Sequence, residues 1–183
     1  MSNNSFMKEV ELQEIQPKTI LSKLPFDNKK CPLILSEQGN ATALFRYSNS
    51  GPFVELFDPF STNLLSALKF SIIQGNFCIF NFGCIENLDL ISPMLDRLKE
   101  RCLEIHKDLY NHIINNTLMK QSFDSLLNLI PFDPHTELVP EIYENSKTTF
   151  RILFFVQIND ISTIKKQRNG PILSLFNCIC IKS

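Results

Sequence analysis

The residues that come closest to a catalytic pattern form a short polar segment between an apolar run and a helical one: Ser36, Glu37, Gln38, Gly39, Asn40 and Ala41. A buried strand, a polar loop with glycine and then a helix is the arrangement with which P-loop NTPases bind phosphate. A working loop also needs several glycines, a lysine for the outer phosphates and Ser or Thr for magnesium. This segment has one glycine and no lysine, and Glu37 would repel phosphate. We therefore predict a vestigial phosphate loop.

A second position that could do chemistry lies at the end of the apolar run Phe77 to Phe82. NTPases of this type place acidic residues there, which hold magnesium and polarise the attacking water. Here the chain reads Asn81-Phe82-Gly83-Cys84, without a charge, and we interpret Glu86 as a solvated loop residue. The residues that a nucleotide hydrolase would need are therefore missing at both positions.

Metal ligands are not predicted either. The six cysteines include no CxxC pair, and Cys178 and Cys180 would share one face of a strand as small apolar side chains. His106 and His112 are six residues apart, which places them on different sides of a helix. We expect no metal site, no catalytic residue and no cofactor, and we do not expect ATP to bind.

The elements that would position these residues are strands and helices in alternation. Apolar runs without a polar alternation are typical of strands covered on both faces. Five such runs lie near 32–35, 53–57, 77–82, 150–158 and 172–181. They predict a three-layer α/β/α sandwich with a mostly parallel five-stranded sheet.

Helices are predicted between the strands from apolar residues at a spacing of three to four. The segments are Thr42 to Tyr47, Leu64 to Ile72 with a stop at Gly75-Asn76, Leu90 to about Leu129 with a break at Asn115-Asn116, and a final piece from Phe123 to Ile130. Three prolines predict a loop over residues 131–141. We divide the chain into a mobile N-terminal arm, residues 1–24, and an α/β domain, residues 25–183, with a helical insertion at about 99–140.

Composition bounds the remaining functions. The chain has 183 residues, of which 44% are hydrophobic and 20% charged, so we expect one globular domain. A formal net charge of −1 gives no electrostatic reason to expect a nucleic acid or a membrane as partner. The N-terminus lacks the pattern of a secretory signal, so we expect an intracellular, soluble protein.

Three of these segments also carry a family resemblance. CPLILSEQGNA resembles the first strand and a defective phosphate loop of dynein heavy chains, in the large subdomain of the fifth of six AAA+ modules in the motor ring. GNFCIFNFG is similar to the third strand of that module. EIYENSKTTFRILFFVQIND is similar to the strand that carries a polar sensor residue in active AAA+ proteins, and Gln157 or Asn159 is nearest to that place.

The resemblance implies a P-loop NTPase (AAA+)-like large subdomain without its lid, which neither binds nor hydrolyses nucleotide and helps to transmit movement round a ring. Its partners would be other AAA+ modules or dynein subunits, and microtubules only indirectly, in the cytoplasm and cytoskeleton or the axoneme of a cilium. Cys31 stands where the family usually has Trp, and residues 99–140 are longer and more helical than the family's connection. The chain would be a fragment, a short isoform or a stand-alone relative, with a sheet edge and apolar surface exposed for association.

Two alternatives stay open. In an atypical nucleotide-binding enzyme, Gly39, Asn40 and Thr42 would replace the phosphate loop, and Lys29, Lys30 or another chain would supply the lysine. An unrelated α/β scaffold would act through its charged surfaces. Binding of Mg-ATP separates the first alternative from the AAA+-like hypothesis, and association with dynein subunits separates the second.

Overall fold

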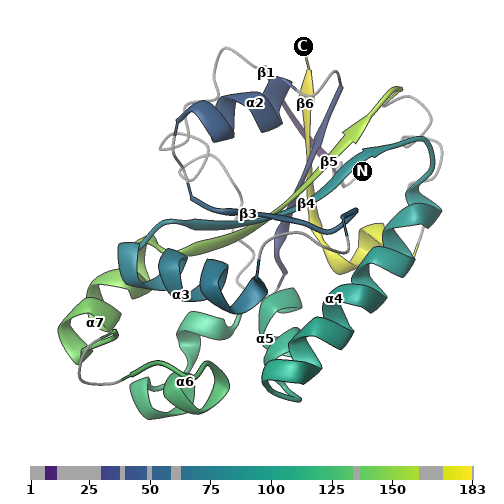
Figure 1. Cartoon of the computed structure of the whole chain (residues 1–183). Coiled ribbons are helices and arrows are strands. Elements are labelled where there is room, and N and C mark those ends of the chain that lie inside the picture. The colour runs from purple at the N-terminus through teal and green to yellow at the C-terminus, as the bar shows by residue number, and fades with distance from the viewer. Residues whose placement is uncertain are drawn as a thin grey trace, which may run out of the picture.

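The computed structural model describes residues 7–11, 30–37, 40–48, 51–58, 63–133, 137–160 and 171–182. In this part of the chain a central sheet carries helices on both faces (Figure 1). Its strands are β1 (Met7–Glu11), β2 (Pro32–Ser36), β3 (Phe53–Glu55), β4 (Phe77–Ile85), β5 (Arg151–Ile158) and β6 (Asn177–Lys182). Its helices are α2 (Asn40–Tyr47), α3 (Leu64–Gln74), α4 (Ile91–Ile105), α5 (Leu109–Ile114), α6 (Phe123–Leu129) and α7 (Pro140–Thr149), with the short 3-10 turns η2 (Leu88–Leu90), η3 (Leu118–Lys120) and η4 (Leu173–Leu175).

The sheet has six strands in the order β1-β6-β2-β5-β4-β3, and each neighbouring pair is parallel. All five strands predicted from the sequence are present, so the predicted α/β sandwich with a parallel sheet is confirmed. Every residue of β2 is buried. Burial on both faces explains why the apolar residues of the central strands do not alternate with polar ones.

The sixth strand lies in the segment that we predicted to be a mobile arm. Residues Met7–Glu11 pair in parallel with β6, from Met7 opposite Cys178 to Glu11 opposite Lys182, and form one edge of the sheet. These five residues therefore belong to the sheet rather than to an arm. The rest of segment 1–24 lies outside the described residues.

Right-handed crossovers explain which helix covers which face. The connection through α2 runs from β2 past β5 and β4 to β3 at the far edge, whereas the connections through α3 and through α4–α7 run in the opposite direction. Helices of the two kinds must then lie on opposite faces, and α2 is indeed separated by the sheet from α3–α7 (Figure 1). Along β5, Phe155 packs under α2 while Phe154 faces the larger core on the other side.

Helix α3 begins and ends where the sequence predicts. The side chain of Asn63 accepts hydrogen bonds from the backbone N–H groups of Leu65 and Ser66, which caps the first turn. Gly75 ends the helix with φ of 63° in the left-handed region. A Cβ atom at this position would lie 2.3 Å from Oγ1 of Thr149, so the turn into β4 requires glycine for both conformation and space.

The predicted helix from Leu90 is in fact several short helices. The predicted break at Asn115-Asn116 is confirmed, with Asn116 at φ of 51°. A further break falls at His106, whose backbone is extended. The prediction that His106 and His112 lie on one helix was therefore wrong. In the described part of the insertion at 99–140, the longer elements are helices. They pack on the sheet face opposite α2.

Two boundaries near the end of the chain differ from the prediction. Helix α7 was missed, because Pro140 was interpreted as part of a loop although proline is favoured in the first turn of a helix, where α7 places it. The last strand begins only at Asn177, since η4 takes up the preceding residues. Among the described residues no helix is long and apolar enough to span a bilayer.

Candidate functional site

The place where an open parallel sheet binds ligands is the crevice outside the carboxyl ends of two strands whose connections leave toward opposite faces. In this fold the two strands are β2, which is followed by α2, and its neighbour β5, whose next described element is η4 (Leu173–Leu175), with Leu173 in the core on the other face. Their last residues are adjacent, because Ser36 of β2 is opposite Gln157 of β5 in the parallel register. The predicted loop and the predicted sensor residues therefore meet at one edge of the sheet.

The junction between β2 and α2 has the strand-loop-helix layout of a phosphate loop. Ser36 ends the strand with 1% of its surface exposed, and its hydroxyl donates to the carbonyl of Glu37 at 3.1 Å. Helix α2 begins at Asn40. Gln38 and Gly39 lie outside the described residues, as do the side chains of Asn40 and Ala41. The described residues, up to Glu37 and from Asn40 onward, thus support the predicted layout of strand, loop and helix.

A lysine substitute is not placed near this junction by the described residues. Lys30 lies two residues before the start of β2 and so at the amino edge of the sheet, one strand length or about 16 Å from the carboxyl edge. Arg46, the other basic residue of segments 30–37 and 40–48, is in the last turn of α2 and pairs with Glu55. The alternative in which Lys30 completes the loop therefore has no geometric support. Lys29 lies outside the described residues.

The position where an NTPase would have a magnesium-binding acid holds a buried amide with partners at both ends. Asn81 of β4 has 5% of its surface exposed, and its Nδ2 donates to Oε2 of Glu55 at 2.5 Å while its Oδ1 accepts from the backbone N–H of Gly83 at 3.1 Å. The guanidinium of Arg46 donates to the other oxygen of Glu55 and lies 4.3 Å from the ring centre of Phe53. This chain of contacts joins α2, β3 and β4.

Sequence reasoning missed Glu55 as part of the site. A carboxylate in a short apolar strand was the available signal, but only the register, in which Glu55 is opposite Asn81, brings the two side chains together. Alternation along the strands places both on the face that α2 covers, the same face as Ser36 and Gln157. The polar residues of this edge therefore form a row beneath the helix.

The sensor-like residues occupy the middle of that row. Gln157 is opposite Ser36 on one side and Cys84 on the other, so it lies between the loop strand and the strand with Asn81. Asn159 follows the strand end, and its Oδ1 accepts a weak hydrogen bond from Sγ of Cys84 at 3.6 Å. Glu86 is exposed just beyond β4, as predicted. The described groups at the centre of the edge are neutral donors and acceptors, namely the hydroxyl of Ser36, the amides of Gln157 and Asn159, and the thiol of Cys84.

The cysteines behave as core residues, with one exception. All six are free thiols, and only Cys84 is exposed. Burial raises the pKa of Cys78, Cys102 and Cys178 to about 12, which leaves them protonated and unreactive at neutral pH. In the part of the chain that the structure describes, no three His, Cys, Asp or Glu side chains are grouped closely enough to hold a metal ion.

Comparison with known proteins does not place the chain in a family: no family model, no curated protein sequence and no solved structure matches it.

Proposed function

We propose that this chain is a non-catalytic AAA+-like module, similar to the large subdomain of the fifth module of a dynein motor ring, that works through protein contacts. The observation that carries the proposal is Asn81. Its amide stands where an ATPase needs a carboxylate, and both ends of that amide are engaged with Glu55 and Gly83. A residue so engaged is not available to hold magnesium.

The order of the strands supports the AAA+-like part of the proposal. A residue that senses the terminal phosphate of ATP has to lie between the loop that holds the phosphates and the acids that hold magnesium. Strand β5, with Gln157 at its end, lies between β2 and β4 in this way. In this chain β2, the strand before the loop, pairs with β5 and β6. In the dinucleotide-binding and flavodoxin-like orders, the strand before the loop pairs with the second or third strand of the fold. Neither order therefore has the arrangement seen here.

The contacts of Arg46 support a mechanical role. In an ATPase, the helix after the phosphate loop and the strand with the acids are linked through the bound nucleotide and its metal ion. Here Arg46 of α2, Glu55 of β3 and Asn81 of β4 are linked directly by hydrogen bonds between side chains. A force applied to α2 would pass to the sheet without a nucleotide. We propose that this rigid link serves a module that transmits movement between neighbouring modules or dynein subunits, in the cytoplasm or in an axoneme.

Calorimetry with Mg-ATP tests the non-catalytic part of the proposal. We expect no binding heat at millimolar nucleotide and no change in melting temperature, for the natural chain and equally for Glu37→Gln, which removes the repelling charge at the loop. Saturable binding by the natural chain would overturn the proposal in favour of an atypical nucleotide-binding protein. Binding by the Glu37→Gln variant alone would show that one charge, rather than the whole site, prevents it.

Association with a dynein heavy chain tests the second part. Two exposed side chains lie before and after β3 in the sequence, namely Tyr47, 89% exposed at the end of α2, and Phe57, 47% exposed just after β3. We expect the tagged chain to co-purify with a dynein heavy chain, and we expect Tyr47→Ser to reduce the yield. Leu103→Ser, in α4 on the other side of the sheet from α2 and 53% exposed, is the matched control (Figure 1). Absence of dynein from the natural complex would favour an unrelated scaffold.

A further inference from the structure

Strand β1 is attached to the rest of the described fold through one neighbour. Its residues Met7–Glu11 pair in parallel with β6 at one edge of the sheet (Figure 1). Among the described elements, β6 is the only one with which β1 makes extensive contact, whereas β6 itself also pairs with β2. Residues 12–31 connect β1 to β2, and this is more than the dozen residues that a parallel crossover needs. The length of the connection therefore does not force β1 to stay on β6.

The strand that β1 covers is apolar on both faces. Cys178 and Cys180 of β6 belong to the core on the side of α3, and each is at most 5% exposed. Ile179 and Ile181 belong to the core under α2 and are equally buried. Without β1, the backbone N–H and C=O groups of β6 that face it would have no partner at an apolar edge. Such an edge favours pairing with another chain.

The sequence of β6 permits this edge to pair with the same edge of a second copy. A two-fold axis perpendicular to the sheet joins two edge strands in antiparallel fashion about one residue, which then faces its own copy. If that residue is Ile179, Cys178 of one copy lies opposite Cys180 of the other. If it is Cys180, the two Cys180 residues lie opposite each other. Because β6 has a single charged residue, at its end, neither register places like charges opposite each other.

Strand β1 does not permit the same kind of pairing. Its sequence is MKEVE, in which charged residues are the majority. Pairing about Lys8 would place two lysines opposite each other, and pairing about Glu9 would do the same with two glutamates. Pairing about Val10 would place Glu9 opposite Glu11 of the other copy. Like charges directly opposite each other destabilise a pair of strands, so β1 resists the self-association that β6 permits.

We propose that β1 is a guard strand, which keeps β6 from pairing with β6 of a second copy of this chain and whose own charges keep the new edge from pairing in turn. Displacement of β1 exposes a self-complementary edge, residues 177–182, and its occupant is the same edge of a second copy. This pairing joins two sheets into one. A two-fold axis perpendicular to the sheet preserves its faces, so α2 of both copies lies on the same side. The inference does not depend on the proposed nucleotide-free function.

Light scattering of the full chain after size-exclusion chromatography tests the proposal, in a Cys84→Ser background that removes the exposed thiol. The variant Glu9→Pro, Val10→Pro opens the edge. Consecutive strand residues direct their N–H groups alternately toward and away from a neighbour, so one of the two prolines removes a donor to β6. Glu9→Ala, Val10→Ala keeps both donors and is the matched control. We expect the proline variant to approach twice the mass of the 21.1 kDa chain, while the background chain and the alanine variant stay monomeric.

Oxidation with diamide reports which strands meet in the dimer. Directly opposite residues of an antiparallel pair have Cα atoms about 4.5–5.5 Å apart, a distance that a disulfide accommodates. In the proline variant we expect a disulfide that joins Cys180 to Cys178 or to Cys180 of the other copy. Non-reducing electrophoresis and peptide mapping identify it. The alanine variant, in which β1 still covers these buried thiols, should not form it.

A second variant keeps the test decisive if the proline variant does not fold, as judged by circular dichroism. Lys8→Val, Glu9→Val, Glu11→Val retains the backbone donors of β1 and removes its charges, so it should associate through β1 itself and without a disulfide at Cys180. Three results would overturn the proposal. They are a background chain that already dimerises with this disulfide, a folded proline variant that stays monomeric or dimerises without it, and a valine variant that stays monomeric.

Discussion

Replacing Asn81 by aspartate introduces the acid that an ATPase would have at this position, and the structure predicts that this substitution destabilises the fold. Nδ2 of Asn81 lies 2.5 Å from Oε2 of Glu55, in a site where Asn81 is 5% exposed. The Asn81→Asp change turns this donor into a second carboxylate oxygen. A buried hydrogen bond thereby becomes a contact between two like charges.

The cost follows from two contributions. Two unit charges about 4 Å apart repel by about 4 kcal/mol at an effective dielectric constant of about 20. The loss of a hydrogen bond to a charged group adds about 1.5–3 kcal/mol. Arg46 lies against the other oxygen of Glu55 and cancels part of the repulsion, and one carboxyl can take up a proton. We therefore expect a net loss of about 2–4 kcal/mol in the free energy of unfolding at pH 8, which a typical domain survives.

The loss should depend on pH with a definite sign. The neighbouring carboxylate raises the folded-state pKa of the pair above the ordinary value of about 4 that holds in the unfolded chain. Between these two values the folded state binds more protons than the unfolded state, so the free energy of unfolding of the variant falls as the pH rises. Urea denaturation of Asn81→Asp and the natural chain at pH 5 and pH 8 measures this. The difference between the two proteins should be smaller at pH 5.

A second substitution provides the control. In the double variant Asn81→Asp, Glu55→Gln, the introduced glutamine amide donates to the introduced carboxylate and the repulsion is absent, so most of the lost stability should return. Two results would contradict this reasoning. One is a free energy of unfolding of Asn81→Asp within about 0.5 kcal/mol of that of the natural chain at pH 8. The other is a double variant no more stable than Asn81→Asp, which would show that the contact between these two side chains does not determine the loss of stability.

Two further predictions concern single residues. Iodoacetamide at pH 8 should label the native chain once, at Cys84, because the buried thiols Cys78 and Cys178 have a pKa of about 12 and react only in urea. Intact mass spectrometry counts the labels. Labelling of a buried thiol in the native chain would contradict the packing. Gly75→Ala should lower the free energy of unfolding by about 1–3 kcal/mol, because alanine disfavours the left-handed conformation and its Cβ would lie 2.3 Å from Oγ1 of Thr149. Adding Thr149→Ala should restore the part of the loss that comes from this steric contact. Urea denaturation measures both variants.

The central strands and α3 could be predicted from the sequence because their signals are local. A strand buried on both faces reads as an unbroken apolar run, as in β2 and in most of β4. Helix α3 has a side-chain cap at Asn63 and a glycine stop at Gly75, both visible in the sequence. The phosphate-loop layout followed from the same local order of strand, polar segment and helix.

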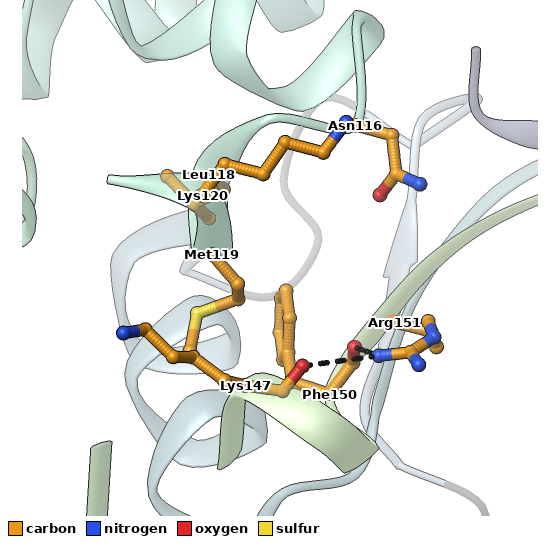
Figure 2. A pocket seen from close by; sticks show the side chains of 7 residues that line it. All are labelled: Asn116, Leu118, Met119, Lys120, Lys147, Phe150 and Arg151. Carbon is orange, nitrogen blue, oxygen red and sulfur yellow. Dashed lines mark hydrogen bonds between the residues drawn. The ribbon is translucent and has the colours of Figure 1, made fainter. Parts of the chain in front are cut away.

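What could not be predicted depends on pairing between distant segments. Strand β1 is short and mixed in charge, and only its pairing with β6 identifies it as a strand. The contact of Glu55 with Asn81 requires the register of two strands that are separated by α3. The hollow between Asn116 and Arg151 (Figure 2) combines residues from the turn after α5 with residues at the start of β5, and neither segment alone has a recognisable motif.

The carboxyl and amino edges of the sheet differ in how their charged side chains are arranged. At the carboxyl edge, where a parallel sheet ordinarily binds its ligand, the guanidinium of Arg46 and the amide of Asn81 both contact the carboxylate of Glu55, so side chains of α2, β3 and β4 are joined there. At the amino edge, Lys120 and Arg151 line a hollow without an acidic lining residue in the described part of the chain.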